Sequence, residues 1–169
     1  MQTASKFFLQ TCLAALVAAP ACAFADVSNV VQSWRTGGGW LTELRQHADG
    51  ARVCSSGKAF REEHPFGLSI VESGQIMLVT LVDEQQPPTV GGAMKFVAGD
   101  RELGNLSAMT QGPAFATIES QSTATRQLIA TLPDQPVSID VGGRHYRADL
   151  TGLTEARRQL QTCMEQAAK

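Results

Sequence analysis

A strand–turn–strand pattern over residues 66–82 constrains the fold of this chain more than any other feature of its sequence. Apolar residues alternate on both sides of Ser73-Gly74, and a two-residue turn there would place Ile70 opposite Met77. The other face of the same hairpin is also apolar, at Val71, Ile76 and Leu78. A hairpin that is apolar on both faces belongs near the centre of a sheet with its second side covered, and a C-terminal helix is the candidate cover.

Other segments also alternate as strands do. They include residues 40–46, a strand through Cys54, residues 94–98 and residues 115–119. A second hairpin is expected over residues 137–150, because Gly142-Gly143 suits a tight turn; it would set Ile139 beside Tyr146 and Asp140 beside His145.

Three segments instead have helical spacing of apolar residues. These are residues 26–34, residues 123–132 and a C-terminal helix that begins near Thr151 or Thr154. The last of these places Cys163 on its apolar stripe. We therefore expect an α+β fold, mainly antiparallel β, as a sheet or sandwich of about seven short strands with the C-terminal helix packed on it.

Residues 1–25 have the pattern of a cleaved signal peptide. Lys6 lies in a polar start, an apolar run follows, and Ala23 and Ala25 are small residues at a cleavage site. Cleavage after Ala25 would leave residues 26–169 as a single globular domain in the periplasm or secreted from the cell. An alternative is a lipoprotein cut before Cys22, in which Cys22 carries the lipid.

The cysteines add a covalent constraint. Of the four in the chain, Cys12 and Cys22 would leave with the signal peptide, and Cys54 and Cys163 remain. In an oxidising compartment two remaining cysteines favour a disulfide between strand and helix, with two unpaired buried thiols as the alternative.

Charge and composition exclude several classes of function. The chain has 14 Lys and Arg, of which Lys6 leaves with the signal peptide, against 16 Asp and Glu, so the mature net charge is −3. Without a basic stripe, nucleic acid is not an expected partner. No segment after the signal peptide is long and apolar enough for a transmembrane helix. The glycine-rich stretches lack a phosphate-binding pattern, so no cofactor is expected.

Two patterns could carry catalysis. Ser55-Ser56-Gly57-Lys58 matches S-x-x-K, in which a lysine one helical turn later activates a serine, but a strand is expected there. His145 opposite Asp140 could form a base and its orienting acid, but an exposed row of polar pairs explains the pattern better. We therefore expect no catalytic residues and no enzyme.

A metal site is not expected either. The three histidines have no metal-ligand spacing. Glu62-Glu63-His64 is the closest cluster, and a solvated loop is the preferred interpretation because adjacent residues of an extended segment point to opposite sides.

Four residues are candidates for contact with a partner. Trp34 and Trp40 could form an exposed platform, although core packing is the more common role of tryptophan. Pro87 and Pro88 lie in a loop over residues 85–92 that could probe another protein.

The order of these features resembles a known family. It comprises Gly38-Gly39-Trp40, the Cys54 strand, the 66–82 hairpin and a closing V-S-I-D-V-G-G-R-H-Y-R-A-D-L-T-G-L-T-E-A, with Leu150, Gly152 and Ala156 in the last part. The chain resembles the invasion-associated locus B family of small periplasmic proteins. It departs from that family by lacking a cysteine soon after Trp40 and by carrying Cys163 in the helix. The resemblance implies a β-rich envelope protein without known catalytic residues.

We therefore predict a non-enzymatic binding protein of the bacterial cell envelope, whose partner is another envelope protein. An inhibitor or immunity-type protein against an envelope enzyme is one alternative, since a small rigid scaffold suits it. A small serine hydrolase that uses Ser55 and Lys58 is the other.

Overall fold

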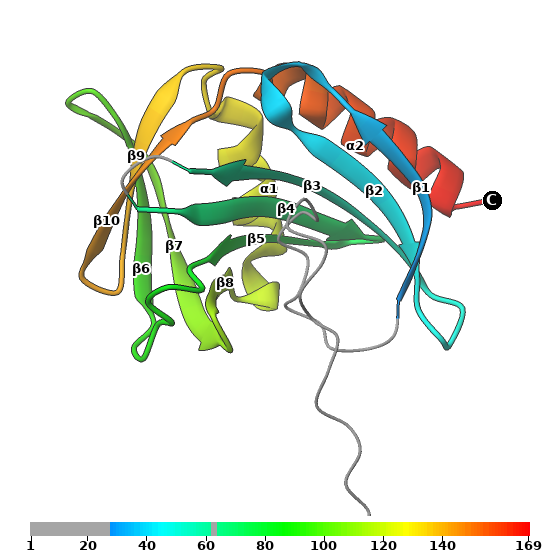
Figure 1. Ribbon diagram of the computed structural model, residues 1–169, viewed down its shortest axis with the longest axis horizontal. Helices are drawn as coiled ribbons and strands as arrows, with labels where there is room; N and C mark the ends of the chain where they lie inside the picture. Colours follow the sequence, from blue (N-terminus) through cyan, green and yellow to red (C-terminus); the bar gives the residue numbers. More distant parts are fainter. Residues whose placement is uncertain (1–27, 62–63) are drawn as a thin grey trace, which may run out of the picture.

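Ten antiparallel strands form one strongly curved sheet in the computed structural model, which describes residues 28–61 and 64–169 (Figure 1). Their order in the sheet is β1-β2-β3-β4-β5-β8-β7-β6-β9-β10. The strands are β1 (Asn29–Arg35), β2 (Leu41–Gln46), β3 (Arg52–Phe60), β4 (Phe66–Ser73), β5 (Ile76–Val82), β6 (Gly92–Ala98), β7 (Arg101–Gln111), β8 (Ala114–Thr117), β9 (Pro136–Val141) and β10 (Arg144–Asp149).

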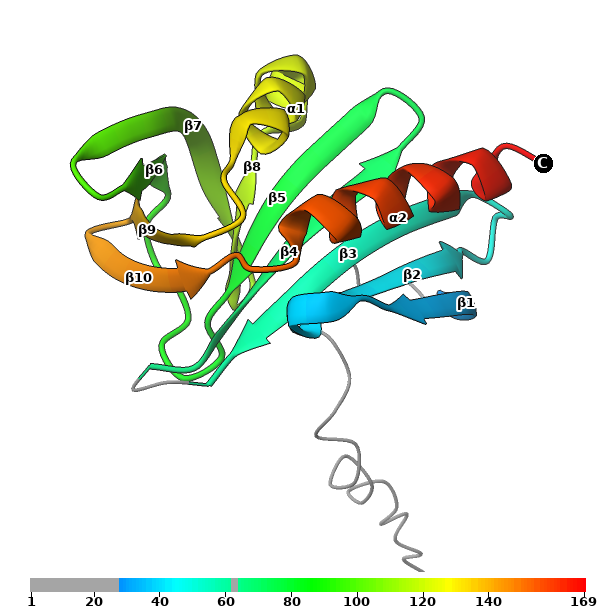
Figure 2. The ribbon, with the colours of Figure 1, turned by 90° about the horizontal axis from the view of Figure 1, so that it is seen from above.

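Two α-helices, α1 (Ser122–Thr131) and α2 (Leu153–Ala167), lie on the same side of this sheet (Figure 2). Helix α2 packs on β2 and β3, whereas α1 packs on β5 and β7. The largest buried side chains lie between the helices and the curved strands: Trp40, Ile70, Leu81, Met94, Phe96, Phe115, Ile139 and Tyr146. The prediction of a mainly antiparallel β fold with a C-terminal helix is confirmed.

The strand count of about seven was too low, and one of the missed strands had been expected to be a helix. Residues 29–35 form the edge strand β1, paired with β2, instead of a helix over 26–34. The valines and Trp34 in this segment favour a strand, and pairing with β2 outweighs the helical spacing. Strand β7 was predicted only in part: a turn at Gly99-Asp100 was expected to lead back toward Leu103 and Leu106, but residues 108–113 were expected to be a loop. The strand instead continues to Gln111, in a stretch where many residues are exposed and polar.

The central hairpin forms with a different register from the one predicted. Its turn is Gly74-Gln75, so Ser73 pairs with Ile76, and Ile70 lies opposite Val79 instead of Met77. Moving a turn by one residue moves each partner by two, which keeps the same side chains on the same face. The prediction of which side chains share a face of the hairpin was therefore correct, although the predicted pairing was wrong.

Helix α2 does not cover the second face of this hairpin, contrary to the prediction. It packs on the face that carries Cys54, and α1 packs on that side too. The opposite face has a shallow hollow of about 510 Å³ with a largely apolar lining, formed by Val53, Val71, Ile76, Leu78, Met109 and Ile118 among others.

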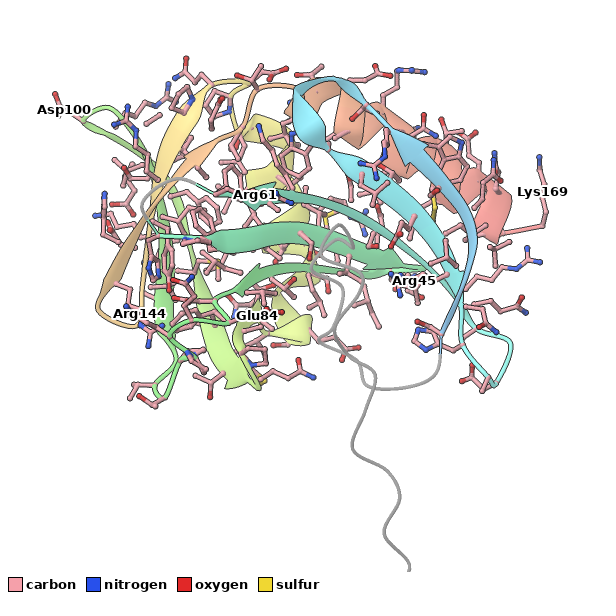
Figure 3. The ribbon with its side chains drawn as sticks, in the orientation of Figure 1. Arg45, Arg61, Glu84, Asp100, Arg144 and Lys169 are labelled. Carbon is pink, nitrogen blue, oxygen red and sulfur yellow. A yellow bond between two sulfur atoms is a disulfide. The ribbon has the colours of Figure 1, made fainter. Side chains whose placement is uncertain are left out.

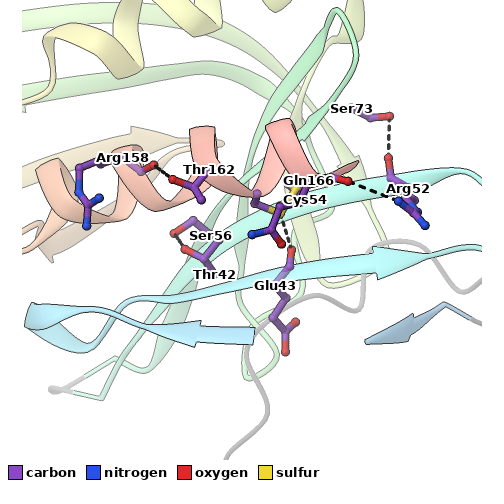
Figure 4. Close-up of a disulfide and its surroundings, with 10 residues drawn as sticks. Thr42, Glu43, Arg52, Cys54, Ser56, Ser73, Arg158, Thr162 and Gln166 are labelled. Carbon is purple, nitrogen blue, oxygen red and sulfur yellow. Dashed lines mark hydrogen bonds between the residues drawn. A yellow bond between two sulfur atoms is a disulfide. The ribbon is translucent and has the colours of Figure 1, made fainter. Parts of the chain in front are cut away.

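The predicted disulfide between Cys54 and Cys163 is present (Figure 4). It joins the first part of β3 to the last turns of α2 with a Cα–Cα distance of 6.0 Å, and both cysteines are fully buried. The Sγ of Cys163 also lies 3.7 Å from the carbonyl oxygen of Glu43. The sheet and the terminal helix are thus linked across 109 positions of sequence.

A second contact fixes the start of α2. Gly38, in the short 3-10 helix Gly37–Gly39, lies so close to Thr151 that a Cβ atom would come within 1.9 Å of the Thr151 carbonyl oxygen. Trp40 Nε1 donates a hydrogen bond of 3.2 Å to that same carbonyl. At the same helix end, the carboxylate of Asp134 accepts from the backbone N–H of Gly152. The Gly-Gly-Trp and Leu-Thr-Gly segments that carry the family resemblance therefore contact each other.

Candidate interaction site

A fully buried carboxylate, that of Asp83, lies at the end of β5 and accepts four hydrogen bonds. Its Oδ2 accepts from Tyr146 Oη at 2.9 Å and from Arg144 Nη1 at 3.1 Å, and it lies 2.8 Å from His64 Nε2. Its Oδ1 accepts from the backbone N–H of Gln86 at 2.8 Å. The exposed fraction of the Asp83 side chain is 0%, so bulk water does not touch the carboxylate.

Three separate segments of the chain bring these groups together. Asp83 directly follows β5, and its own backbone N–H donates to Pro113 just before β8. Arg144 and Tyr146 belong to β10, which begins after the Gly142-Gly143 turn. The second predicted hairpin formed in the predicted register, and this directs Tyr146 inward beside Ile139.

The hydrogen bonds set the protonation states in this cluster. Burial raises the pKa of Asp83, but the hydrogen bonds from His64, the Gln86 backbone and Tyr146 outweigh it, so the pKa lies below 3.8. Burial, together with the bond to Asp83, raises the pKa of Tyr146 above 10.0. Asp83 is therefore an ionised acceptor and Tyr146 a neutral donor at neutral pH.

The cluster holds the connection between β5 and β6. We call residues 84–90 the braced loop. Arg144, besides its bond to Asp83, donates to the carbonyl oxygen of Gln86 and, at 3.1 Å, to that of Pro87. Figure 3 shows Arg144 and Glu84 along the lower side of the molecule. A single arginine thus joins the buried carboxylate to the backbone of the exposed loop.

Two glycines fix the far end of the braced loop. A Cβ on Gly91 would lie 2.5 Å from the carbonyl oxygen of Ala108 in β7, and a Cβ on Gly142 would lie 2.8 Å from the carbonyl oxygen of Val90. Pro88 is buried, which anchors the middle of the loop. The loop is therefore held at its start, its middle and its end.

The braced loop exposes both polar and apolar side chains to solvent. Its exposed residues are Glu84, Gln85, Gln86, Pro87, Thr89 and Val90. Val90 is 67% exposed, more than the three other large apolar side chains on the surface of the described residues. Preorganised backbone and an exposed apolar side chain suit this loop to contact with another protein.

The four candidate interaction residues divide between surface and core. Pro87 is exposed in the braced loop, whereas Pro88 is buried beneath it. Trp40 is only 1% exposed and belongs to the core, and Trp34 packs partly against that core. The two tryptophans therefore do not form an exposed platform.

The serine and lysine of the S-x-x-K pattern lie in one strand and point to opposite faces of the sheet. Ser55 and Lys58 are three residues apart in β3, and the side chains of a strand alternate. Lys58 Nζ donates to the carbonyl oxygen of Asp149 at 2.6 Å instead. The structure does not bring this pair together.

Two of the three histidines, His64 and His145, have side-chain partners. His145 Nδ1 lies 2.6 Å from Asp140 as the hairpin predicted, but both side chains are exposed, at 66% and 47%. His64 was expected in a solvated loop, and it instead contacts buried Asp83 and packs its ring 5.8 Å from that of Tyr146. In residues 28–61 and 64–169, no group of three or more His, Cys, Asp or Glu side chains could hold a metal ion.

Sequence reasoning missed Asp83 and Arg144 as partners. One signal was present: Asp83 directly follows an apolar strand, where an unpaired carboxylate would be expensive to bury. Its partners lie 19, 61 and 63 positions away in the chain, so their convergence was not visible.

No helix in the described part of the chain is long and apolar enough to cross a membrane.

Comparison with protein-family models, curated proteins and solved structures gave no match. The resemblance to the invasion-associated locus B family therefore stays a prediction.

Proposed function

We propose that this chain is an exported, non-enzymatic binding protein of the bacterial cell envelope, and that it contacts another envelope protein through the braced loop. One observation carries this proposal: fully buried Asp83, together with Arg144, holds in place a loop that exposes Pro87 and Val90. Burying an ionised carboxylate has a large desolvation cost, and two of the four hydrogen bonds that offset it come from the Gln86 backbone and from Arg144, the groups that also order this loop.

The length of the connection supports the same interpretation. β5 and β6 are three strand spacings apart in the sheet, a distance of about 14 Å, which about four extended residues could span. The connection has nine residues, 83–91. The additional residues form the exposed part of the loop, and a rigid loop loses little conformational entropy on binding.

Export rests on two further features. Residues 1–25 have the pattern of a signal peptide, and they lie outside the part of the chain that the structure describes. The Cys54–Cys163 disulfide is compatible with an oxidising compartment such as the periplasm.

An inhibitor or immunity-type protein against an envelope enzyme is the second candidate. The observation that favours it is the same rigid loop on a disulfide-bonded scaffold, since enzyme inhibitors bind with little change in backbone conformation. A stoichiometric enzyme partner that loses activity when bound would distinguish this function from general binding.

Site-specific photo-crosslinking in the native cell tests the proposal. A photo-reactive amino acid replaces Gln85 in the braced loop or, as a control, Asp100 in the exposed turn between β6 and β7. We expect a crosslinked protein partner from position 85 and none from position 100. No product from position 85, or the same product from both positions, would contradict the proposal.

A further inference from the structure

We infer that the partner receives the braced loop in a neutral, apolar pocket, and that Val90 is the side chain that fills it. This inference rests on the proposed function and names the chemistry of the partner. Its basis is the charge of the loop, the position of Val90 and the state of the neighbouring arginine.

The exposed loop carries almost no charge. The braced loop begins with one acidic residue, exposed Glu84, and residues 85–92 contain no acidic or basic side chain, in a chain in which 18% of residues are charged. The cation that contacts this loop, Arg144, is paired with Asp83 and bound to two loop carbonyls. Beyond Glu84, a partner therefore meets amide, hydroxyl and apolar groups, and long-range attraction between charges contributes little there.

Val90 is placed as an anchor for such a partner. Its side chain is 67% exposed, whereas its carbonyl oxygen is confined against Gly142 and the next residue is confined against β7. Valine is branched at Cβ and has few rotamers to lose on binding. An exposed apolar side chain on a fixed backbone, surrounded by neutral polar groups, is the arrangement of a central contact with a polar rim.

The test uses a matched pair of substitutions in protein that carries the photo-reactive residue at position 85. Val90→Thr keeps the shape of the side chain and adds a hydroxyl group. Val31→Thr makes the same change on edge strand β1, at a valine that is 51% exposed. The crosslinked product is measured in native envelope extract at about 50 mM and at about 500 mM NaCl, over which charge interactions are strongly screened.

We expect Val90→Thr to lower the yield of the crosslinked product by about tenfold, because a hydroxyl group would be buried without a partner. Val31→Thr should leave the yield unchanged, and salt should change it by less than about twofold. A yield that Val90→Thr leaves unchanged, or one that falls steeply with salt, would overturn the apolar pocket while leaving the binding function intact. Absence of any product from wild-type Val90 would instead overturn the proposed function.

Discussion

The two ends of this molecule are held together by different chemistry. Around α2, the disulfide and the close approach of Gly38 to Gly152 join the helix to β2 and β3. Around the braced loop, one buried carboxylate and one arginine hold three segments by hydrogen bonds. The first end is closed by covalent and steric contacts, whereas the second orders backbone that faces solvent.

This difference supports the proposal that the loop end contacts a partner. At the α2 end the polar groups are used within the fold: the Trp40 indole donates to Thr151, and Asp134 accepts from the first turn of the helix. At the loop end the same kind of internal pairing leaves an apolar side chain, Val90, on the surface. Substitutions at the α2 end should therefore change stability alone, whereas substitutions at the loop end should change stability and, under the proposed function, binding.

Removal of the disulfide has the largest expected effect. Replacing both Cys54 and Cys163 with serine should lower the free energy of unfolding by about 4 kcal/mol, since the bond closes a long loop of the unfolded chain. Urea denaturation of the oxidised wild type and the double variant measures this. Crosslinking from position 85 should persist under conditions in which the variant is folded. A decrease in unfolding free energy of less than about 1 kcal/mol would contradict the claim that the disulfide stabilises this end.

The next effect is expected at the loop end. Asp83→Asn should lower the free energy of unfolding by about 3 kcal/mol, because it removes a buried charge that satisfies Arg144 and Tyr146. Asp140→Asn is the matched control, because Asp140 also bonds a histidine but is exposed; it should cost under about 1 kcal/mol. Equal losses of unfolding free energy in the two variants would contradict the claim that buried Asp83 stabilises the loop end.

A glycine substitution tests the backbone contact at the α2 end. Gly152→Ala should cost about 2 kcal/mol more than Gly50→Ala, in the same denaturation measurement. The two glycines have similar backbone angles, φ +90° and +87°, but only at Gly152 would a Cβ meet backbone, 2.1 Å from the Gly37 carbonyl oxygen. An equal loss of unfolding free energy in both variants would mean that the close contact between Gly152 and Gly37 does not contribute to stability.

The smallest expected effect is a pH dependence of stability that arises from Asp83 at the loop end. The pKa of folded Asp83 is lowered, so its stabilisation is fully present above its ordinary pKa of 3.8 and is lost as the pH falls through the folded value. The stability difference between wild type and Asp83→Asn should therefore shrink from about pH 5 to about pH 2. A difference that stays constant over that range would mean that Asp83 is not held ionised.

Local patterns in the sequence predicted most of the scaffold. Both hairpins, α1, α2 and the disulfide follow from alternation, turn residues and helical spacing over short stretches. The helix predicted over residues 26–34 was wrong because the spacing of its apolar residues suits a helix, and only the pairing with β2 selects a strand. The prediction of which face of the central hairpin α2 covers was wrong, because the side on which a helix packs depends on the curvature of the whole sheet.

The candidate site was harder to predict than the scaffold. Pro87 and Pro88 mark the loop, but burial separates their roles, and that burial depends on β10 lying against the loop. Arg144 looked like an ordinary residue after a glycine turn. Its function as a brace arises from contacts across 57 to 61 positions of sequence, which no local pattern encodes.

Backbone order in the braced loop tests the account most directly. ¹⁵N relaxation of the amides of Gln85, Thr89 and Val90 should give order parameters near about 0.85, the range of rigid backbone, and Asp83→Asn should lower them toward about 0.6. Order parameters already below about 0.6 in the wild-type protein would contradict the claim that a buried carboxylate and Arg144 hold this loop ready for a partner.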